Sequence, residues 1–526
     1  MIWRDKNNVL WILIISTLIL LWGSIPNWVG QLTQTRDVHF RGIYFDSQDY
    51  AVDISMMRAG AQGQWAYEFR FTTEPPHPAY LRMFYIFLGH ISKWTRIPPE
   101  QTFELARWLL GFTALFALYA LLNRIFADHF WTRIAFLLAV FGSGAGWLQL
   151  IFHWDPGLIT PIDFWFIDAY FFFSLTLFPH FAFALTGMSI ACLFWLNYLE
   201  THHWRNLMGF AITAILVQFT NPIAFAVVDM GIAGAMLFTG WRERRIPWRD
   251  VGALAVLAFV QLPLLAYYFF VLTRDPNWSQ YTIQNQTLSP PPIYYLWGFV
   301  LLWPFALAGS FVAVRTKLPV LGMAVFWAMA AFLLAYAPFY IQRRFLLGIT
   351  IPLTILAIWA MRELVETFTQ KHPTWARWRT SAVMSFVFLA SFSSIYLSIG
   401  QALYLRTYPK EFFYPASVDE AAKWLSQNAK ANDFVLASKQ TSQIIAQKTD
   451  LRVYFGHEME TLAFDAKQEE VKSFYNGSKS DAWLKNAKVS WVIYGPLERS
   501  LNQNFRPSQV LRLVYIYQDI QIYATK

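Results

Sequence analysis

Long apolar runs recur through the first 400 residues, and they constrain the fold more than any other feature of the chain. A helix of about 20 apolar residues crosses the roughly 30 Å hydrocarbon core of a bilayer. We therefore expect a polytopic α-helical membrane protein with about 11 transmembrane helices. The expected spans lie at roughly 9–29, 104–125, 133–152, 180–199, 206–221, 223–240, 251–273, 292–314, 318–338, 345–361 and 381–404.

The composition agrees with a chain surrounded by membrane lipids. Hydrophobic residues make up 56% of the sequence and charged residues 14%, against about 25% charged in ordinary soluble domains. The aromatic residues lie within the apolar runs rather than between basic residues, so we expect no nucleic-acid partner. The single cysteine, Cys192, excludes an intrachain disulfide and a thiolate metal site.

The loops between the apolar runs differ in positive charge. With a cytoplasmic N-terminus, the inner loops hold 15 Lys and Arg residues, and the outer loops beyond the first hold three, Arg274, Arg343 and Arg344. Cytoplasmic loops of membrane proteins carry the excess of positive charge. We therefore expect a multi-pass protein of the cell membrane with a cytoplasmic N-terminus. Residues 79–94 are expected to form an interfacial helix on the outer face, because a span there would invert every later loop.

Two regions follow from this topology. Residues 1–407 form the transmembrane domain, which includes a long first outer loop at 30–103. Residues 408–526 carry more charge and alternate short β-rich runs with amphipathic helical patterns, which predicts a small α/β domain on the extracytoplasmic side. This tail lacks G-x-G-x-x-G and P-loop motifs, so we expect no nucleotide site in it.

Three carboxylates stand close together at the start of the first outer loop, in the stretch GIYFDSQDYAVDI (42–54). Asp46 has the position of a helix N-cap and Asp49 that of the N3 residue, which explains two acids by capping. A carboxylate at the outer rim of the membrane can also act as a general base. We expect Asp53, one turn beyond Asp49, to be solvated.

Further polar residues on the outer loops are candidates for a substrate cavity. Glu74 and His77 flank the prolines of TTEPPHP (72–78), but two ligands alone do not make a metal site. Asp163 and Asp168 lie among aromatic residues in the loop at 153–179, where desolvation would be costly, so we expect them to face an aqueous cavity. His180, at the outer end of an apolar run, is either a hydrogen-bonded structural residue or part of this cavity.

Arg343 and Arg344 are adjacent in APFYIQRRFLLG (337–348), on the side of the membrane where positive charge is disfavoured. Either side chain could extend to lipid headgroups. A forked, charge-assisted clamp on a phosphate suits arginine better than lysine. Their outer placement favours the phosphate clamp.

Several of these features together resemble one family. A first span is followed by a long outer loop with an early acidic motif (FDSQDY, 45–50), then by G-x-W (63–65) and by HPAY (77–80) before the interfacial helix. This arrangement is similar to the GT-C class of polyprenyl-phosphate-sugar-dependent glycosyltransferases, which includes protein O-mannosyltransferases and lipid A aminoarabinose transferases. The resemblance covers roughly residues 1–405.

The resemblance implies roles for individual residues. The acidic first-loop motif of the family falls on Asp46, with Tyr50 following, but Ser47 replaces the usual Glu, so Asp46 and Asp49 both remain candidates for the base. The acidic second outer loop falls on the region of Asp163 and Asp168. The late arginine that contacts the donor phosphate falls on Arg343 or Arg344. The tail would have at most a role in acceptor binding.

The function implied is transfer of a sugar from a polyprenyl-phosphate donor to an acceptor hydroxyl on the outer face, with inversion and an Asp general base. The acceptor would be a lipid, a glycan or a protein. No cofactor is required for such donors; a divalent metal is possible but is not indicated by the residues. One alternative is a non-catalytic binder of lipid-linked sugars, a flippase or a transporter, and another is an assembly or sensing protein whose outer α/β domain binds a partner. Transporters more often carry charge near the middle of the bilayer, whereas here it lies at the outer rim.

Overall fold

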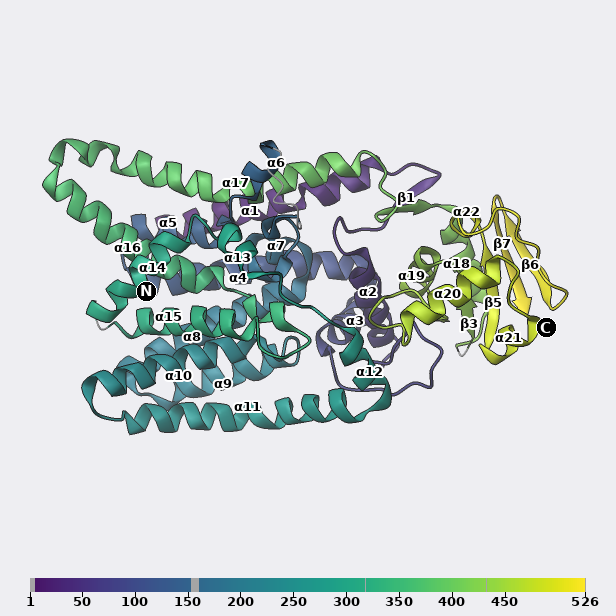
Figure 1. Cartoon of the computed structure of the whole chain (residues 1–526), viewed down its shortest axis with the longest axis horizontal. Helices are drawn as coiled ribbons and strands as arrows, with labels where there is room; N and C mark the ends of the chain where they lie inside the picture. The colour runs from purple at the N-terminus through teal and green to yellow at the C-terminus, as the bar shows by residue number, and fades with distance from the viewer. Residues whose placement is uncertain (1–4, 153–159, 317, 432, 526) are drawn as a thin grey trace. The chain divides into compact units, whose positions relative to one another are not determined.

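The structure, a computed structural model, describes residues 5–152, 160–316, 318–431 and 433–525. The first residues of the second outer loop, 153–159, lie outside the described part. The chain divides into two compact units (Figure 1). Unit 1 comprises Met1–Ile25, Ala106–Tyr267 and Gln286–Gly400, and unit 2 comprises Pro26–Leu105, Tyr268–Asn285 and Gln401–Lys526. The tail expected as a domain, 408–526, therefore shares unit 2 with the whole of the first outer loop, 30–103.

Seven helices in the described residues are long and apolar enough to cross a membrane, which makes the chain a multi-pass membrane protein. An eighth span is present if α13 (Pro292–Gly298) and α14 (Trp303–Thr316), bent by 91° at their junction, are counted as one. The seven are α1 (Lys6–Thr33), α4 (Pro99–Phe126), α8 (Pro179–Thr201), α10 (Ala224–Glu243), α11 (Trp248–Arg274), η4 with α16 (Gln342–Lys371) and η5 with α17 (Pro373–Leu405).

Three of the eleven expected spans are shorter helices: α5 (His129–Phe141), α9 (Trp204–Gln218) and α15 (Pro319–Leu334). For α5 the reason is local. The glycine-rich stretch that starts at Gly142 ends the helix, and the backbone N–H of Ser143 donates to the carbonyl of Ala390 at 2.7 Å instead of continuing the helical pattern. The chain resumes as the short helix α6 (Gly146–Ile151). By their length, the described helices therefore give seven or eight membrane spans, whereas the apolar runs of the sequence predicted about eleven.

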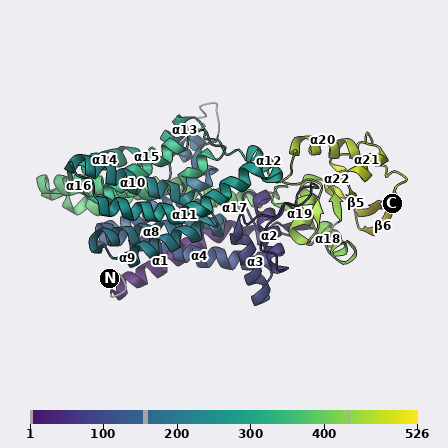
Figure 2. The same ribbon diagram turned by 90° about the horizontal axis from the view of Figure 1, so that it is seen from below.

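The core of unit 1 is built around α16 (Thr350–Lys371). In the apolar stretch of η4 with α16 (Gln342–Lys371), 89% of the residues are buried, and α16 packs against α5, α14 and α15. A second bundle pairs α8 with α9 and α10 with α15 (Figure 1 and Figure 2). Some serine and threonine side chains of these helices donate to the carbonyl four residues earlier, as Thr186 does to Ala182 at 2.7 Å and Ser189 does to Leu185 at 2.9 Å. Internal hydrogen bonding of this kind lets polar side chains lie within apolar spans.

Between these helices, unit 1 carries short elements that hold the second outer loop. They are η2 (Ile162–Phe164), η3 (Ile167–Ala169), α7 (Phe171–Leu177) and η4 (Gln342–Leu346). The 3₁₀ helices η3 and η4 pack against each other. This contact brings the acidic second loop next to the segment that contains the paired arginines.

Unit 2 contains a five-stranded sheet of order β4-β3-β5-β7-β6, in which β3 is parallel to β4 and β5, and β7 is antiparallel to β5 and β6. The strands are β3 (Phe434–Leu436), β4 (Arg452–Val453), β5 (Val489–Tyr494), β6 (Leu511–Tyr517) and β7 (Ile520–Thr525). The helices of this region are α18 (Ser417–Asn428), α19 (Lys439–Lys448), α20 (Phe464–Tyr475), α21 (Asp481–Asn486) and α22 (Pro496–Arg499). The expected small α/β region is confirmed, and its last two strands, β6 and β7, form an antiparallel hairpin that is yellow in Figure 1.

The first outer loop forms the other part of unit 2. It contains β1 (Val38–Phe40), which pairs with β2 (Phe413–Pro415), and the helices α2 (Ser47–Ala61) and α3 (Met83–Thr95), while α12 (Pro276–Gln284) comes from a later loop. Helices α2 and α3 pack closely because Gly60 faces the carbonyl of Ile86 and Gly89 faces that of Met57. A Cβ at either glycine would lie about 2 Å from the facing oxygen. The helix predicted at 79–94 is α3, and its contact with α2 supports the acidic residues of that helix.

Candidate functional site

The first turn of α2 presents two of the predicted acids. Asp46 is the N-cap, and its carboxylate accepts a hydrogen bond from the backbone N–H of Asp49 at 3.2 Å. The capping interpretation is therefore confirmed for Asp46. Asp46 is exposed and has φ 45°, the left-handed region that is uncommon for any residue except glycine. Backbone strain of this kind concentrates at functional sites.

Asp49 contacts a histidine from the tail. Its carboxylate Oδ1 lies 2.9 Å from Nε2 of His457, whose side chain is 5% exposed while that of Asp49 is 40% exposed. The other ring nitrogen, Nδ1, accepts the backbone N–H groups of Met459 and Glu460, both at 3.1 Å. Because Nδ1 is an acceptor, the proton of a neutral ring lies on Nε2 and is donated to Asp49.

Asp53 is buried, and the expectation that it is solvated was wrong. Its side chain is 1% exposed and lies 3.1 Å from a guanidinium nitrogen of Arg82. A second nitrogen of Arg82 lies 2.8 Å from Glu460, which is fully buried and accepts a hydrogen bond from the Tyr67 hydroxyl at 2.5 Å. The reason is geometric, since the α2 face that carries Asp53 packs on α3 instead of facing water.

The three ionisable groups of this buried contact, Asp53, Arg82 and Glu460, shift one another's pKa values. Burial raises the pKa of Asp53 well above its ordinary value, although Arg82 acts against the rise. Burial likewise raises the pKa of Glu460, opposed by Arg82 and His457. For Arg82 burial alone would lower the pKa, but Tyr281, Asp53 and Glu460 together raise it. Arg82 therefore stays charged between two carboxyl groups that resist ionisation.

Glu74 and His77 each have a partner of their own. Glu74 accepts hydrogen bonds from the Lys467 ammonium at 2.7 and 2.8 Å, and Nδ1 of His77 lies 2.8 Å from the carboxylate of Asp275. Burial raises the pKa of Glu74, but the Lys467 charge outweighs it and lowers the pKa. In unit 2, these contacts tie the proline-rich segment to α20 and to the start of α12. The described residues contain no group of three or more His, Cys, Asp or Glu side chains that could hold a metal.

Tyr50 is buried on the inner side of α2. Its ring packs edge-to-face on Phe103 with centroids 5.1 Å apart, and its hydroxyl lies over Gly42, where a Cβ would come within 3.0 Å of it. Gly42 has φ 92°, a conformation that favours glycine. Burial raises the pKa of Tyr50 well above its ordinary value. The side chain therefore packs beneath the acidic turn.

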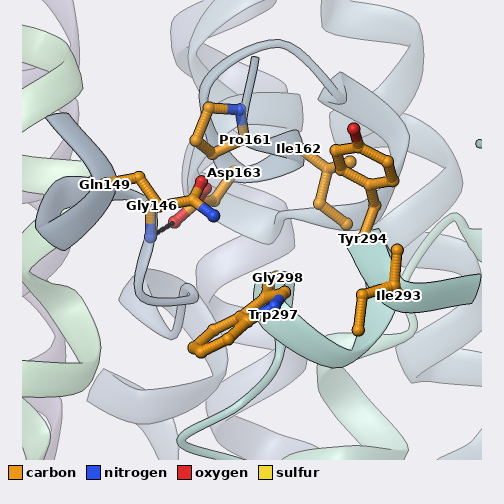
Figure 3. Close-up of a pocket in the computed structure, with 9 residues that line it drawn as sticks. All are labelled: Gly146, Gln149, Pro161, Ile162, Asp163, Ile293, Tyr294, Trp297 and Gly298. Atoms are coloured by element: carbon orange, nitrogen blue, oxygen red, sulfur yellow. Dashed lines mark hydrogen bonds between the residues drawn. The ribbon is translucent and has the colours of Figure 1, made fainter. Parts of the chain in front are cut away.

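In unit 1, Asp163 is buried beside a cavity of about 60 Å³ (Figure 3). Its carboxylate accepts the backbone N–H of Gly146 at 3.1 Å, and Ile162, Tyr294 and Trp297 complete much of the lining. Burial raises the pKa of Asp163 to about 6, although hydrogen bonds from Ser393 and the Gly146 backbone oppose the rise. We expected Asp163 to face an aqueous cavity. The cavity beside it is small, because the space could hold only a few waters.

Asp168 and Arg343 lie on the contacting 3₁₀ helices η3 and η4. The guanidinium carbon of Arg343 lies 5.1 Å from the ring centroid of Trp165 and 5.8 Å from that of Phe166. Both arginines, Arg343 and Arg344, are partly exposed. Stacking on two aromatic rings restricts the rotamers of Arg343 and leaves a planar fork oriented in advance.

His180 is the second residue of α8. It is partly exposed, and its ring lies 4.1 Å from that of Phe181 and 5.8 Å from that of Phe178. The ring therefore belongs to an aromatic cluster at the start of this span. This placement is compatible with both interpretations of His180.

The predicted site residues thus fall into two groups. Asp46, Asp49, Tyr50, Glu74 and His77 belong to unit 2. The second group, in unit 1, consists of Asp163, Asp168, His180, Arg343 and Arg344. Within unit 1 the structure brings Asp168 close to Arg343.

The sequence did not predict four ionisable residues that contact the acids of unit 2 or one another. They are Arg82, His457, Glu460 and Lys467. A signal for two of them was present in the tail, where GHEME (456–460) places a histidine and two acids within five residues next to a strand. The partner of such a short motif is about 400 residues away in the sequence, so spacing alone could not identify it.

Comparison with known proteins identifies the fold. No family model matches the chain, and a search by sequence against characterised proteins finds no significant match. Among solved structures, the chain is similar to ArnT from Cupriavidus metallidurans bound to undecaprenyl phosphate, with a TM-score of 0.55 and 12% identity over 99% of this chain and 98% of that one.

A second similar structure is the archaeal oligosaccharyltransferase AglB from Archaeoglobus fulgidus, in complex with an inhibitory peptide and a dolichol-phosphate. Its TM-score is also 0.55, at 12% identity over 93% of this chain and 70% of that one. At such low identity these similarities establish the fold alone. The GT-C-like fold predicted from the sequence is confirmed.

Proposed function

We propose that this protein is an integral-membrane glycosyltransferase that moves a sugar from a polyprenyl-phosphate-linked donor to an acceptor hydroxyl. The observation that carries the proposal is the similarity over nearly the whole chain to two structures that contain a polyprenyl phosphate, undecaprenyl phosphate in ArnT and dolichol-phosphate in AglB. The charge of the loops supports a cytoplasmic N-terminus and a reaction on the outer face. A lipid, a glycan or a protein would supply the hydroxyl.

The proposed chemistry begins with a carboxylate of the acidic turn. Asp46, with Asp49 as the second candidate, takes the proton of the acceptor hydroxyl. The acceptor oxygen then forms a bond to the anomeric carbon from the face opposite the phosphate, and the bond from that carbon to the phosphate oxygen breaks. The configuration inverts, and the electron pair leaves with the lipid phosphate. Exposure of Asp46 and its fixed capping position support this role.

Arg343 and Arg344 would hold the donor phosphate. The negative charge on the phosphate grows as the bond breaks, and cationic groups already oriented toward it stabilise the transition state most. The stacking of Arg343 on Trp165 and Phe166 supports the assignment, because a restrained guanidinium loses less entropy on binding. No cofactor is required in this scheme, since the arginines take the charge that a metal would otherwise neutralise.

The remaining predicted residues have supporting roles in the proposal. Asp168 and His180 provide polar contacts for the donor sugar. Glu74 and His77 hold the proline-rich segment through Lys467 and Asp275. Tyr50 supports the acidic turn from below, and Asp163 orders the second loop through Gly146.

The proposal is tested with the purified protein in liposomes that contain a panel of polyprenyl-phosphate-linked hexoses and pentoses, each with a ¹⁴C label in the sugar. Added membrane extract supplies acceptors. Transfer releases free polyprenyl phosphate and moves label into a new product. A flippase or a non-catalytic binder would leave the sugar on its lipid, so intact donor with every sugar would contradict the proposal.

The arginine assignment has its own binding test with undecaprenyl phosphate as the probe. Each hydrogen bond to a charged group contributes about 1.5–3 kcal/mol, so Arg343→Ala and Arg344→Ala should each weaken binding about tenfold or more. Arg274→Ala removes another arginine of the outer loops, at the end of α11, and serves as the matched control with unchanged affinity. Equal affinities in all three variants would remove the clamp from the proposal.

A further inference from the structure

The acidic turn of α2 is held by a residue that lies more than 400 positions later in the chain. His457 donates from Nε2 to the Asp49 carboxylate at 2.9 Å, and the backbone N–H of Asp49 donates to the Asp46 carboxylate at 3.2 Å. A continuous chain of hydrogen bonds therefore runs from the tail to both candidate bases. All three residues belong to unit 2.

The loop around His457 is held by hydrogen bonds to its backbone groups. The hydroxyl of Thr461 accepts the N–H groups of Gly456 and His457 at 3.0 and 3.2 Å, and the Thr461 N–H donates to the His457 carbonyl at 2.9 Å. The side chain of Gln443 donates to the carbonyl of Gly456 at 2.7 Å. The imidazole is thus fixed at its backbone as well as at its Nδ1.

His457 cannot itself act as the base. Its side chain is 5% exposed, Nδ1 already accepts two backbone N–H groups, and Nε2 faces a carboxylate. No ring nitrogen is left to take a proton from an acceptor. The effect of His457 on any reaction must therefore pass through Asp49.

We infer that His457 is a positioning residue for the acidic pair Asp46 and Asp49. The inference rests on the proposed function and extends it, since it makes the C-terminal region a contributor to the reaction centre instead of an acceptor-binding accessory. A donor at Nε2 orients the Asp49 carboxylate. It also restrains the first turn of α2, on which Asp46 depends.

Two substitutions separate this role from a purely structural one. In His457→Gln the amide N–H reaches the place of Nε2 and keeps a donor for Asp49, but the loop loses its acceptor at Nδ1. In His457→Asn the amide oxygen takes the place of Nδ1 and keeps the acceptor for the loop, but the donor to Asp49 is lost. The two variants are therefore opposite controls for each other.

Sugar transfer from the labelled polyprenyl-phosphate donor decides between them. We expect His457→Gln to stay within about threefold of the wild-type kcat and His457→Asn to lose at least about tenfold, with an unchanged KM for the donor, because small misplacements of reacting groups are costly. Full activity of His457→Asn would overturn the inference. Equal losses in both variants would overturn it as well, because the hydrogen bonds from the loop N–H groups to Nδ1 would then affect the rate as much as the donor to Asp49.

A second readout does not depend on activity, so that failure of the inference and failure of the proposed function remain distinguishable. In protein labelled with ¹⁵N-histidine, the resonance assigned by its absence in His457→Gln should show a proton on Nε2. Asp49→Leu should shift that resonance, and Glu469→Gln, which alters an exposed carboxylate of the same unit that pairs with Lys472, should not. If the wild type transfers no sugar but this pattern holds, the function is wrong and the contact stands. A resonance with the proton on Nδ1, or one that is indifferent to Asp49→Leu, would refute the contact itself.

Discussion

The guanidinium of Arg82 lies 2.8 Å from the carboxylate of Glu460, a side chain with no exposed surface. The same guanidinium reaches Asp53 at 3.1 Å. Arg82 has φ 55°, so the backbone at the start of α3 adopts a left-handed conformation while its side chain joins the two acids. One cation thus joins the first outer loop to the tail within unit 2.

Loss of Arg82 should destabilise unit 2 strongly. Removing one partner of a buried polar contact is strongly destabilising, and Arg82→Leu would leave two buried carboxyl groups without the donor that they share. We expect a loss of about 3 kcal/mol or more, seen as a lower midpoint of thermal unfolding in detergent. Arg96→Leu, which follows α3 and lies outside the cluster, is the matched control. A midpoint equal to that of the control would show that the bridge adds nothing to stability.

The stability of the protein should depend on pH through Asp53. Burial raises its pKa well above the ordinary 3.8, so at intermediate pH the folded state keeps a proton that the unfolded chain has lost. The stabilising contribution is fully present below the unfolded value and is lost as pH rises through the folded value. The unfolding temperature of the wild type should therefore rise relative to that of Asp53→Asn as the pH falls from 8 to 5. Parallel curves for the two proteins would contradict this assignment.

Glu74 and Lys467 should behave as a structural pair. Lys467 is nearly buried, and Thr72 accepts a further hydrogen bond from its ammonium at 2.9 Å. Lys467→Met should cost about 1–3 kcal/mol, and Glu74→Gln in the same chain should restore part of the loss because it removes the unpaired charge. Unfolding of the four proteins in a double-mutant cycle measures the coupling. Strict additivity of the two losses would mean that the contact is energetically neutral.

The fold was largely predictable because its main signals are local. Apolar runs such as 251–273 reach the length that a bilayer requires, and the alternation in LRLVYIYQDIQIYAT (511–525) corresponds to the β6–β7 hairpin. Asp46 was predictable as an N-cap because capping depends on residues three positions apart. Less predictable were the lengths of the shorter helices, since the end of α5 depends on a hydrogen bond from Ser143 to Ala390.

Of the candidate site, the sequence singles out only the acids of the first loop and the paired arginines. Asp46, Asp49 and Arg343 stand out by their charge in apolar surroundings. The partner of Asp49 does not, because His457 lies in a charged tail, where the short motif GHEME (456–460) gives no indication of a partner in the first outer loop. Asp53 was misjudged for a related reason: helical spacing alone does not tell which face of α2 will be covered by α3.

The most direct test of the account compares sugar transfer by wild type and Asp46→Asn in the same liposomes. Asparagine caps a helix as well as aspartate and tolerates the left-handed conformation, so the variant should unfold at the wild-type temperature. A general base contributes about 10²- to 10⁴-fold to a rate. The account predicts transfer of the labelled sugar by the wild type and a rate at least about 100-fold lower in Asp46→Asn, whereas equal rates in the two proteins would contradict it.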